Sequence, residues 1–178
     1  MRIRQSRYSM AMKGHRILSI TAWALLAFIA FATLSPYSLR PELTKTEPGL
    51  VVMLEHVGAF GLLGLLFYFR YPGRPRAVCL VVLGSAIALE LAQSFLPDRH
   101  ARFVDASEKI VGGGAGILLG VALLPVLTSP GGLLSRIDQQ WRAPALKAVD
   151  SETRELAIGF LAVMLFALAL VAFENLRR

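Results

Sequence analysis

Apolar and polar residues alternate in long blocks along this chain, and five apolar blocks are long enough to form membrane-spanning helices. They cover about residues 17–35, 51–69, 77–96, 104–127 and 156–173. A helix needs roughly 20 apolar residues to cross the hydrocarbon core of a bilayer. The pattern therefore predicts an all-α fold: a polytopic membrane bundle of about five transmembrane helices, with a four-helix core and a C-terminal helix added to it.

The polar segments between these blocks divide the chain into four parts. We expect a basic cytoplasmic N-terminus over 1–16, a four-helix membrane core over 17–127, a polar loop over 128–155, and a C-terminal transmembrane helix with its tail over 156–178. Within the loop, apolar residues at helical spacing around Trp141 indicate a short interfacial helix. The last apolar block carries no polar side chain, so we expect it to face lipid and to take no part in a site. A cleaved signal peptide is an alternative for the first block, because Ala30-Phe31-Ala32 fits a small-x-small cleavage site.

Composition and charge support a membrane protein. The 178 residues are 55% apolar and only 17% charged, and the mean hydropathy is positive, which is unusual for a soluble domain. The net charge of +7 lies mostly between apolar blocks, so it indicates topology, and we expect no nucleic-acid partner. The single cysteine, Cys79, excludes an intrachain disulfide.

Orientation follows from where the positive residues fall. They are more numerous in the N-terminal segment and in the segments predicted to lie on its side of the membrane than in the others. Since cytoplasmic loops are enriched in Lys and Arg, we expect a cytoplasmic N-terminus. Arg177 and Arg178 disagree with this count, so an even number of spans, with the last block lying flat or re-entrant, is an alternative.

Ionisable and amide side chains inside the apolar blocks mark a candidate site. With alternating helix directions, the polar residues of three blocks fall roughly 7–10 Å below one interface, next to a basic turn. The predicted ligand-binding residues are His56, Glu90, Gln93, Arg99, Arg102, Asp105 and Lys109. We expect Glu90 and Asp105 to pair with Arg99, Arg102 or Lys109, and His56 and Gln93 to supply hydrogen bonds. The alternative is a set of salt bridges that fixes helix register and binds nothing.

The mixed charge of this site suits a headgroup that carries phosphate. The cations would bind the phosphate. The acids would orient those cations or accept hydrogen bonds from an amine or a sugar hydroxyl. We expect no cofactor and no metal: no H-E-x-x-H or H-x-x-E-H pattern occurs, although Glu55, His56 and Glu90 are a possible metal set. The chain contains no G-x-S-x-G motif, so nothing in it indicates a serine nucleophile. In the alternative of an enzyme, Glu90 or Asp105 would act as an acid or base. The sequence identifies no catalytic residue.

Two stripes of small residues predict close helix contacts. One has Gly84, Ala88 and Ala92 every four residues, on the face opposite Glu90 and Gln93, so the helix over 77–96 should be central. The other comprises Gly112, Gly116 and Gly120. Such spacing in an apolar segment is typical of close helix packing, either within the bundle or against a partner membrane protein or a second copy of the chain.

The ordered polar residues resemble a known family. The motifs are His56-x-x-x-Phe60, then Glu90-x-x-Gln93-x-Phe95-x-Pro97-x-Arg99, then Asp105, Gly112 and Gly116. Together they resemble the VanZ-like membrane proteins over roughly Val51 to Gly120. The resemblance implies a small helical bundle in the bacterial cytoplasmic membrane and an association with susceptibility to glycopeptide antibiotics, but no defined reaction.

The chain departs from the family pattern at two places. Val52 and Met53 stand where the family usually has an Asp-Lys pair, and Lys109 stands where it tends to have Asn. Taken together, the residues predict a protein that binds an anionic lipid or a lipid-linked envelope precursor at an outer-leaflet site. The alternatives are an intramembrane enzyme acting on such a lipid and a structural or accessory membrane subunit.

Overall fold

The computed structural model describes residues 2–35, 49–96, 102–128 and 149–176, with side chains from Gly14 onward in the first helix. These residues form five helices and no strand, as the pattern predicts. The helices are α1 (Arg2–Leu34), α2 (Gly49–Arg70), α3 (Pro75–Gln93), α4 (Phe103–Thr128) and α6 (Val149–Leu176). Each of the five contains a segment long and apolar enough to cross a membrane.

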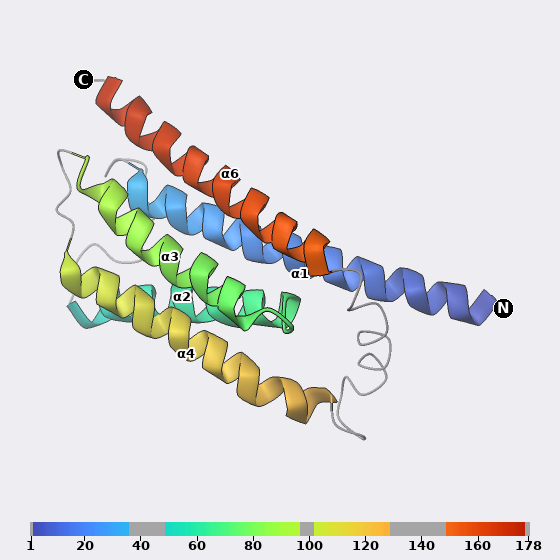
Figure 1. Ribbon diagram of the computed structural model, residues 1–178. Coiled ribbons are helices and arrows are strands. Elements are labelled where there is room, and N and C mark those ends of the chain that lie inside the picture. Colours follow the sequence, from blue (N-terminus) through green and yellow to red (C-terminus); the bar gives the residue numbers. More distant parts are fainter. Residues whose placement is uncertain (1, 36–48, 97–101, 129–148, 177–178) are drawn as a thin grey trace.

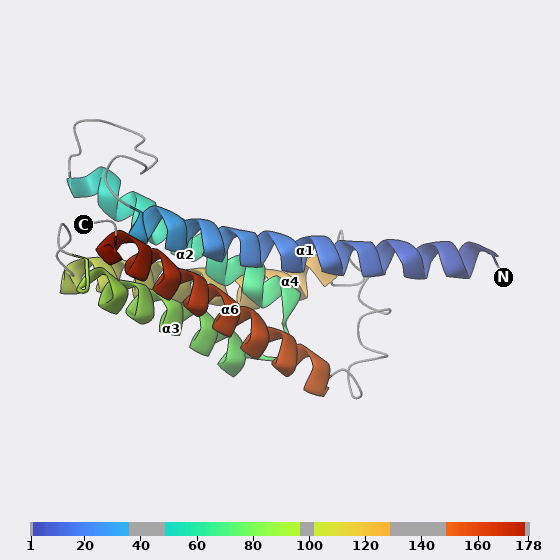
Figure 2. The same ribbon diagram turned by 90° about the horizontal axis from the view of Figure 1, so that it is seen from above.

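The helices run up and down through one bundle (Figure 1). The end of α1 and the start of α2 lie at one end of the bundle, and the turn from α2 to α3 lies at the other. α3 packs against each of the other four helices, so it is central, as expected. The N-terminal part of α1 continues as helix and projects beyond the bundle in both views (Figures 1 and 2).

Helix α6 runs the full length of the bundle. Its spanning segment is Ser151–Leu176, and near its end the Asn175 amide donates to the Phe95 carbonyl oxygen at 3.4 Å, just after α3. The start of α1 and the end of α6 therefore lie at opposite ends of the bundle (Figure 1). This arrangement differs from the alternative in which the last block lies flat or re-enters. The expected interfacial helix around Trp141 lies outside the described residues.

Local chemistry explains where α3 begins and ends. Pro75 occupies its first turn, where the missing N–H costs nothing because that N–H has no partner within the helix. The Arg74 N–H donates to the Tyr71 carbonyl oxygen at 3.0 Å and closes the preceding turn. At the other end, the N–H groups of Ser94, Phe95 and Leu96 each donate three residues back. These bonds tighten the last turn and satisfy carbonyls that the helix leaves open.

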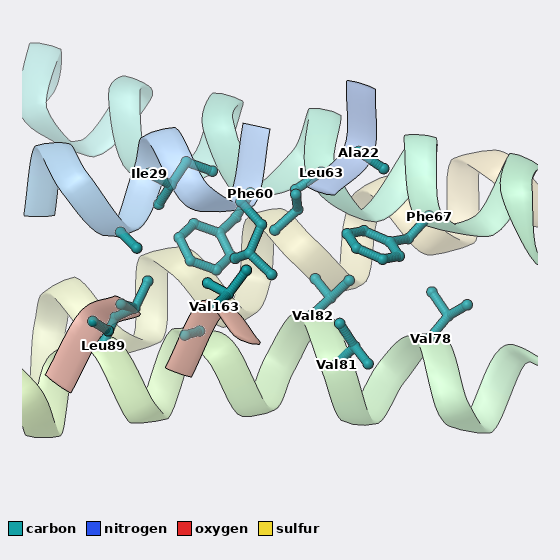
Figure 3. Packing of buried hydrophobic residues seen from close by; sticks show 14 of the residues in the cluster. Ala22, Ile29, Phe60, Leu63, Phe67, Val78, Val81, Val82, Leu89 and Val163 are labelled. Atoms are coloured by element: carbon teal, nitrogen blue, oxygen red, sulfur yellow. The ribbon is translucent and has the colours of Figure 1, made fainter. Parts of the chain in front are cut away.

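Large apolar side chains fill the centre of the bundle. Phe60, Leu63 and Phe67 of α2 point toward Val78 and Val82 of α3 (Figure 3), and all five are buried. Trp23 of α1 meets Phe67 edge-on, with ring centroids 4.9 Å apart. The first helix is therefore packed into the core.

The closest approach in the bundle is between α2 and α4. A Cβ on Gly112 would collide with the Val57 backbone, one on Gly116 with the Gly61 backbone, and one on Gly120 with the Tyr68 side chain. The second predicted stripe of small residues thus faces α2. The first stripe is looser where it meets α6: a Cβ on Gly84 would only reach ordinary contact with Phe160, at 3.9 Å.

Candidate functional site

The up-and-down topology brings three helix segments to one end of the bundle: the first half of α2, the last turns of α3 and the first turns of α4 (Figure 1). Five of the ionisable side chains in these segments form what we call the polar layer: His56, Glu90, Asp105, Glu108 and Lys109. The layer divides into two parts, because α4 sends Glu108 toward α2 and Lys109 toward α3.

The first part is a buried ion pair between α3 and α4. The Lys109 Nζ lies 2.5 Å from Glu90 Oε2, and the two side chains are 2% and 8% exposed. The other carboxylate oxygen, Glu90 Oε1, accepts a hydrogen bond from the Arg102 backbone N–H at 2.8 Å. Both oxygens of Glu90 are therefore engaged. A ligand that displaced Lys109 would leave Glu90 buried without its cation, which is costly. This pair holds α3, α4 and the chain before α4 together.

The second part lies between α2 and α4 and is more open. The His56 Nδ1 is 2.9 Å from Glu108 Oε2, and each side chain is 18% exposed. Asp105, one turn earlier on the same face of α4, places a carboxylate oxygen within 4.8 Å of the donor atoms of the other two residues. We call His56, Asp105 and Glu108 the His56 trio. Their donor atoms are close enough together to hold a metal ion.

The structure does not bring together every predicted site residue. Gln93 is directed toward α1, where its Nε2 donates to the Thr33 carbonyl oxygen at 3.1 Å. Arg102 is exposed and meets Glu90 through its backbone only, and Arg99 lies outside the described residues. Asp105 makes no ion pair with any cation in the described part of the chain. Glu90 does pair with Lys109, one of the three expected partners.

Sequence reasoning missed Glu108 as a member of the site. Its signal was its spacing of three from Asp105, which puts both carboxylates on one face of a helix. The metal set considered from the sequence, Glu55 with His56 and Glu90, is not the one the structure assembles. The Glu90 carboxylate is committed to Lys109, and His56 meets acids of α4.

A second set of charges lies at the opposite end and was not predicted. We call it the α6 ion-pair cluster: Arg70, Arg74, Glu152 and Glu155, together with the Ser19 hydroxyl that bonds to Glu155. Arg70 at the end of α2 bonds Glu155 at 2.8 Å and Glu152 at 3.5 Å. Ser19 of α1 donates to the other Glu155 oxygen at 2.5 Å, and Arg74 lies 3.8 Å from Glu152.

This cluster corrects the expectation that the last helix only faces lipid. Because α6 begins at Val149, Glu152 and Glu155 belong to its first turns and not to the preceding loop. Apolar side chains of the helix are buried against α1 and α3, including Leu156, Val163 and Ala167. The last helix is therefore an integral part of the bundle.

Tyr71 lies beside this cluster, in the turn between α2 and α3. The Arg70 guanidinium carbon is 4.4 Å from the centroid of the Tyr71 ring. Burial raises the pKa of the Tyr71 phenol above its usual value. The face of the ring offers Arg70 a cation–π contact.

We found no match to a known protein family, to a curated protein or to a solved structure. The class of protein therefore follows from the fold alone. Five helices long and apolar enough to cross a membrane make this chain a multi-pass integral membrane protein.

Proposed function

We propose that this membrane protein binds the headgroup of an anionic lipid or a lipid-linked cell-envelope precursor at the polar layer. The proposal includes the VanZ-like resemblance, the bacterial cytoplasmic membrane as the location, and an N-terminus on the cytoplasmic side. One observation carries it: within an apolar bundle, three helices gather ionisable groups at one end, and the His56 trio among them keeps part of its surface exposed.

On this proposal, Arg102 and the groups of the polar layer have different parts. Arg102 is exposed at the start of α4 and presents a guanidinium that suits a phosphate. Asp105 and Glu108 are acceptors for an amine or for sugar hydroxyls. Lys109, expected from the sequence to hold the anion, is neutralised by Glu90 and positions α4 instead. Near the start of α4 the chain thus carries a cation and two acids, which suits a headgroup carrying both phosphate and hydrogen-bond donors.

Native mass spectrometry of the purified full chain tests this proposal. We expect the wild type to retain a phospholipid or a polyprenyl-linked lipid. Arg102→Ala removes only the side chain, so the backbone bond to Glu90 is kept, and bound lipid should fall about tenfold, as expected from losing one charged hydrogen bond. Arg76→Ala is the matched control, because Arg76 is also exposed but lies at the other end of α3. Wild type without lipid, or equal retention by both variants, would contradict headgroup binding.

An enzymatic role is the second candidate, and the His56–Glu108 contact favours it. An imidazole held by a carboxylate is the arrangement that orients a general base. The base would be His56, and not Glu90, whose two oxygens are engaged. Incubation with labelled envelope lipids should give a product that His56→Gln abolishes and Glu55→Gln preserves. Absence of any product with the wild type counts against catalysis.

A role as an accessory subunit would use a different surface from the one expected. The stripe of Gly112, Gly116 and Gly120 is covered by α2. A partner protein or a second copy would therefore have to bind elsewhere on the bundle.

A further inference from the structure

The His56 trio combines donor types that favour a metal ion. It offers one imidazole nitrogen and two carboxylate oxygens, contributed by two helices, and all three donor atoms lie within 4.8 Å of one another. All three side chains are partly buried, so they are held near one another and still reachable from outside. A mixture of one nitrogen and two oxygen donors suits Zn²⁺ or Mn²⁺ better than Mg²⁺ or Ca²⁺, which prefer oxygen alone.

The backbones that carry these donors are fixed by close packing. Asp105, Glu108 and Gly112 follow each other at spacings of three and four, so they share one face of α4. That face meets α2 at Gly112, where even a methyl group would collide with the Val57 backbone, the residue next to His56. The two helices therefore cannot separate at this level without losing their closest contact. Such a rigid support keeps ligands near a productive geometry.

The charges of the His56 trio also favour a bound cation. Two carboxyl groups lie close together around a single imidazole, and like charges at this range repel. Lys109 follows Glu108 directly in sequence but is turned to Glu90 on α3. Asp105 has no cationic partner among the described residues. A divalent cation would neutralise both carboxylates in a setting where water is scarce.

We propose that His56, Asp105 and Glu108 bind a divalent transition-metal ion, Zn²⁺ or Mn²⁺. The metal takes the place of the proton between His56 Nδ1 and Glu108. A metal-binding imidazole is neutral and carries a single proton, which then sits on Nε2, so the Nδ1 proton moves to that nitrogen or leaves to water. Donor distances of about 2.1 Å require ligand atoms roughly 3.4 Å apart, so the carboxylate of Asp105 turns inward while Glu108 withdraws slightly from His56. Three protein ligands leave a coordination position for water or for a phosphate oxygen. Metal binding itself does not depend on the headgroup proposal.

Titration of the full chain with metal tests the site without any lipid substrate. The protein is purified in detergent, stripped with a chelator, and titrated separately with Zn²⁺, Mn²⁺ and Mg²⁺ by calorimetry. Elemental analysis after removal of excess metal gives the stoichiometry. We expect one equivalent of Zn²⁺ or Mn²⁺ per chain and much weaker binding of Mg²⁺. His56→Ala and Glu108→Gln should each weaken binding at least tenfold, since even residues that only support a ligand have effects of 10–100-fold.

Glu55→Gln is the matched control. It removes one carboxylate beside His56 without touching the trio, and it should bind metal like the wild type. Circular dichroism and gel-filtration profiles check that each variant is folded. The site is overturned if the wild type binds neither Zn²⁺ nor Mn²⁺ more tightly than millimolar, or if His56→Ala and Glu108→Gln keep wild-type affinity. Loss of lipid retention in Arg102→Ala with metal binding intact would leave both proposals standing, and absence of bound lipid alone would remove only the headgroup proposal.

Discussion

The two ends of the bundle use charge in different ways. In the α6 ion-pair cluster, Arg70 bonds two acids, and Glu155 bonds both Arg70 and Ser19. In the polar layer, Glu90 and Lys109 also pair as opposite charges. The His56 trio differs, because it places two acids around one histidine. Charges that pair with their opposites explain helix attachment. An excess of one sign in a partly open position favours a bound ligand, and this contrast is why we propose the site at the α3–α4 end of the bundle.

Lys109→Met is expected to have the largest effect on stability. It leaves the buried Glu90 carboxylate without its cation, which should lower the free energy of unfolding by about 3–5 kcal/mol. Thermal unfolding in detergent measures the loss. The double variant Glu90→Leu with Lys109→Met removes both charges and should recover most of it. A single variant as stable as the wild type would show that the pair is not held in a dry environment.

Gly116→Ala tests the close packing that supports the His56 trio. The added Cβ would meet the Gly61 backbone, and overpacking of this kind costs about 1–3 kcal/mol. Gly114→Ala is the matched control on the same helix, because nothing lies within 4 Å of its Cβ position. Since alanine is the better helix former, this control should be stabilising by up to about 1 kcal/mol. Equal melting temperatures for the two variants would contradict the contact between α2 and α4.

Arg70→Ala should have the smallest of these effects, and it separates the two ends. Its acidic partners are 31% and 39% exposed, so we expect a loss of about 1–2 kcal/mol. Faster proteolysis near the start of α6 should accompany it, while metal binding at the polar layer stays unchanged. Arg154→Ala, on the exposed side of α6, is the control. Metal binding that fell with Arg70→Ala would mean that the two ends are not independent.

Much of the fold could be predicted from the sequence because apolar length and proline positions are local signals. The five spans, the break before Pro75 and the central position of α3 follow from them. The level of the candidate site also follows, since antiparallel helices bring the start of one beside the end of the next. Which side chains pair with one another at that level does not follow from the sequence. They depend on how α4 is rotated about its axis, and one residue corresponds to about 100°.

The start of α6 shows the other limit of sequence reasoning. Glu152 and Glu155 lie in a polar segment, so hydropathy assigned them to a loop. They are helical in the structure, and Arg70, more than eighty positions earlier, compensates their charge. Long-range compensation of this kind leaves no mark in a local window of sequence.

Glu108 and Lys109 are consecutive, yet they contact different neighbouring helices. A twist of α4 in either direction would stretch one of these contacts and compress the other. The two contacts together restrain the rotation of α4 about its own axis. A ligand bound at Glu108 would therefore act on the same helix segment that the Glu90–Lys109 pair holds to α3.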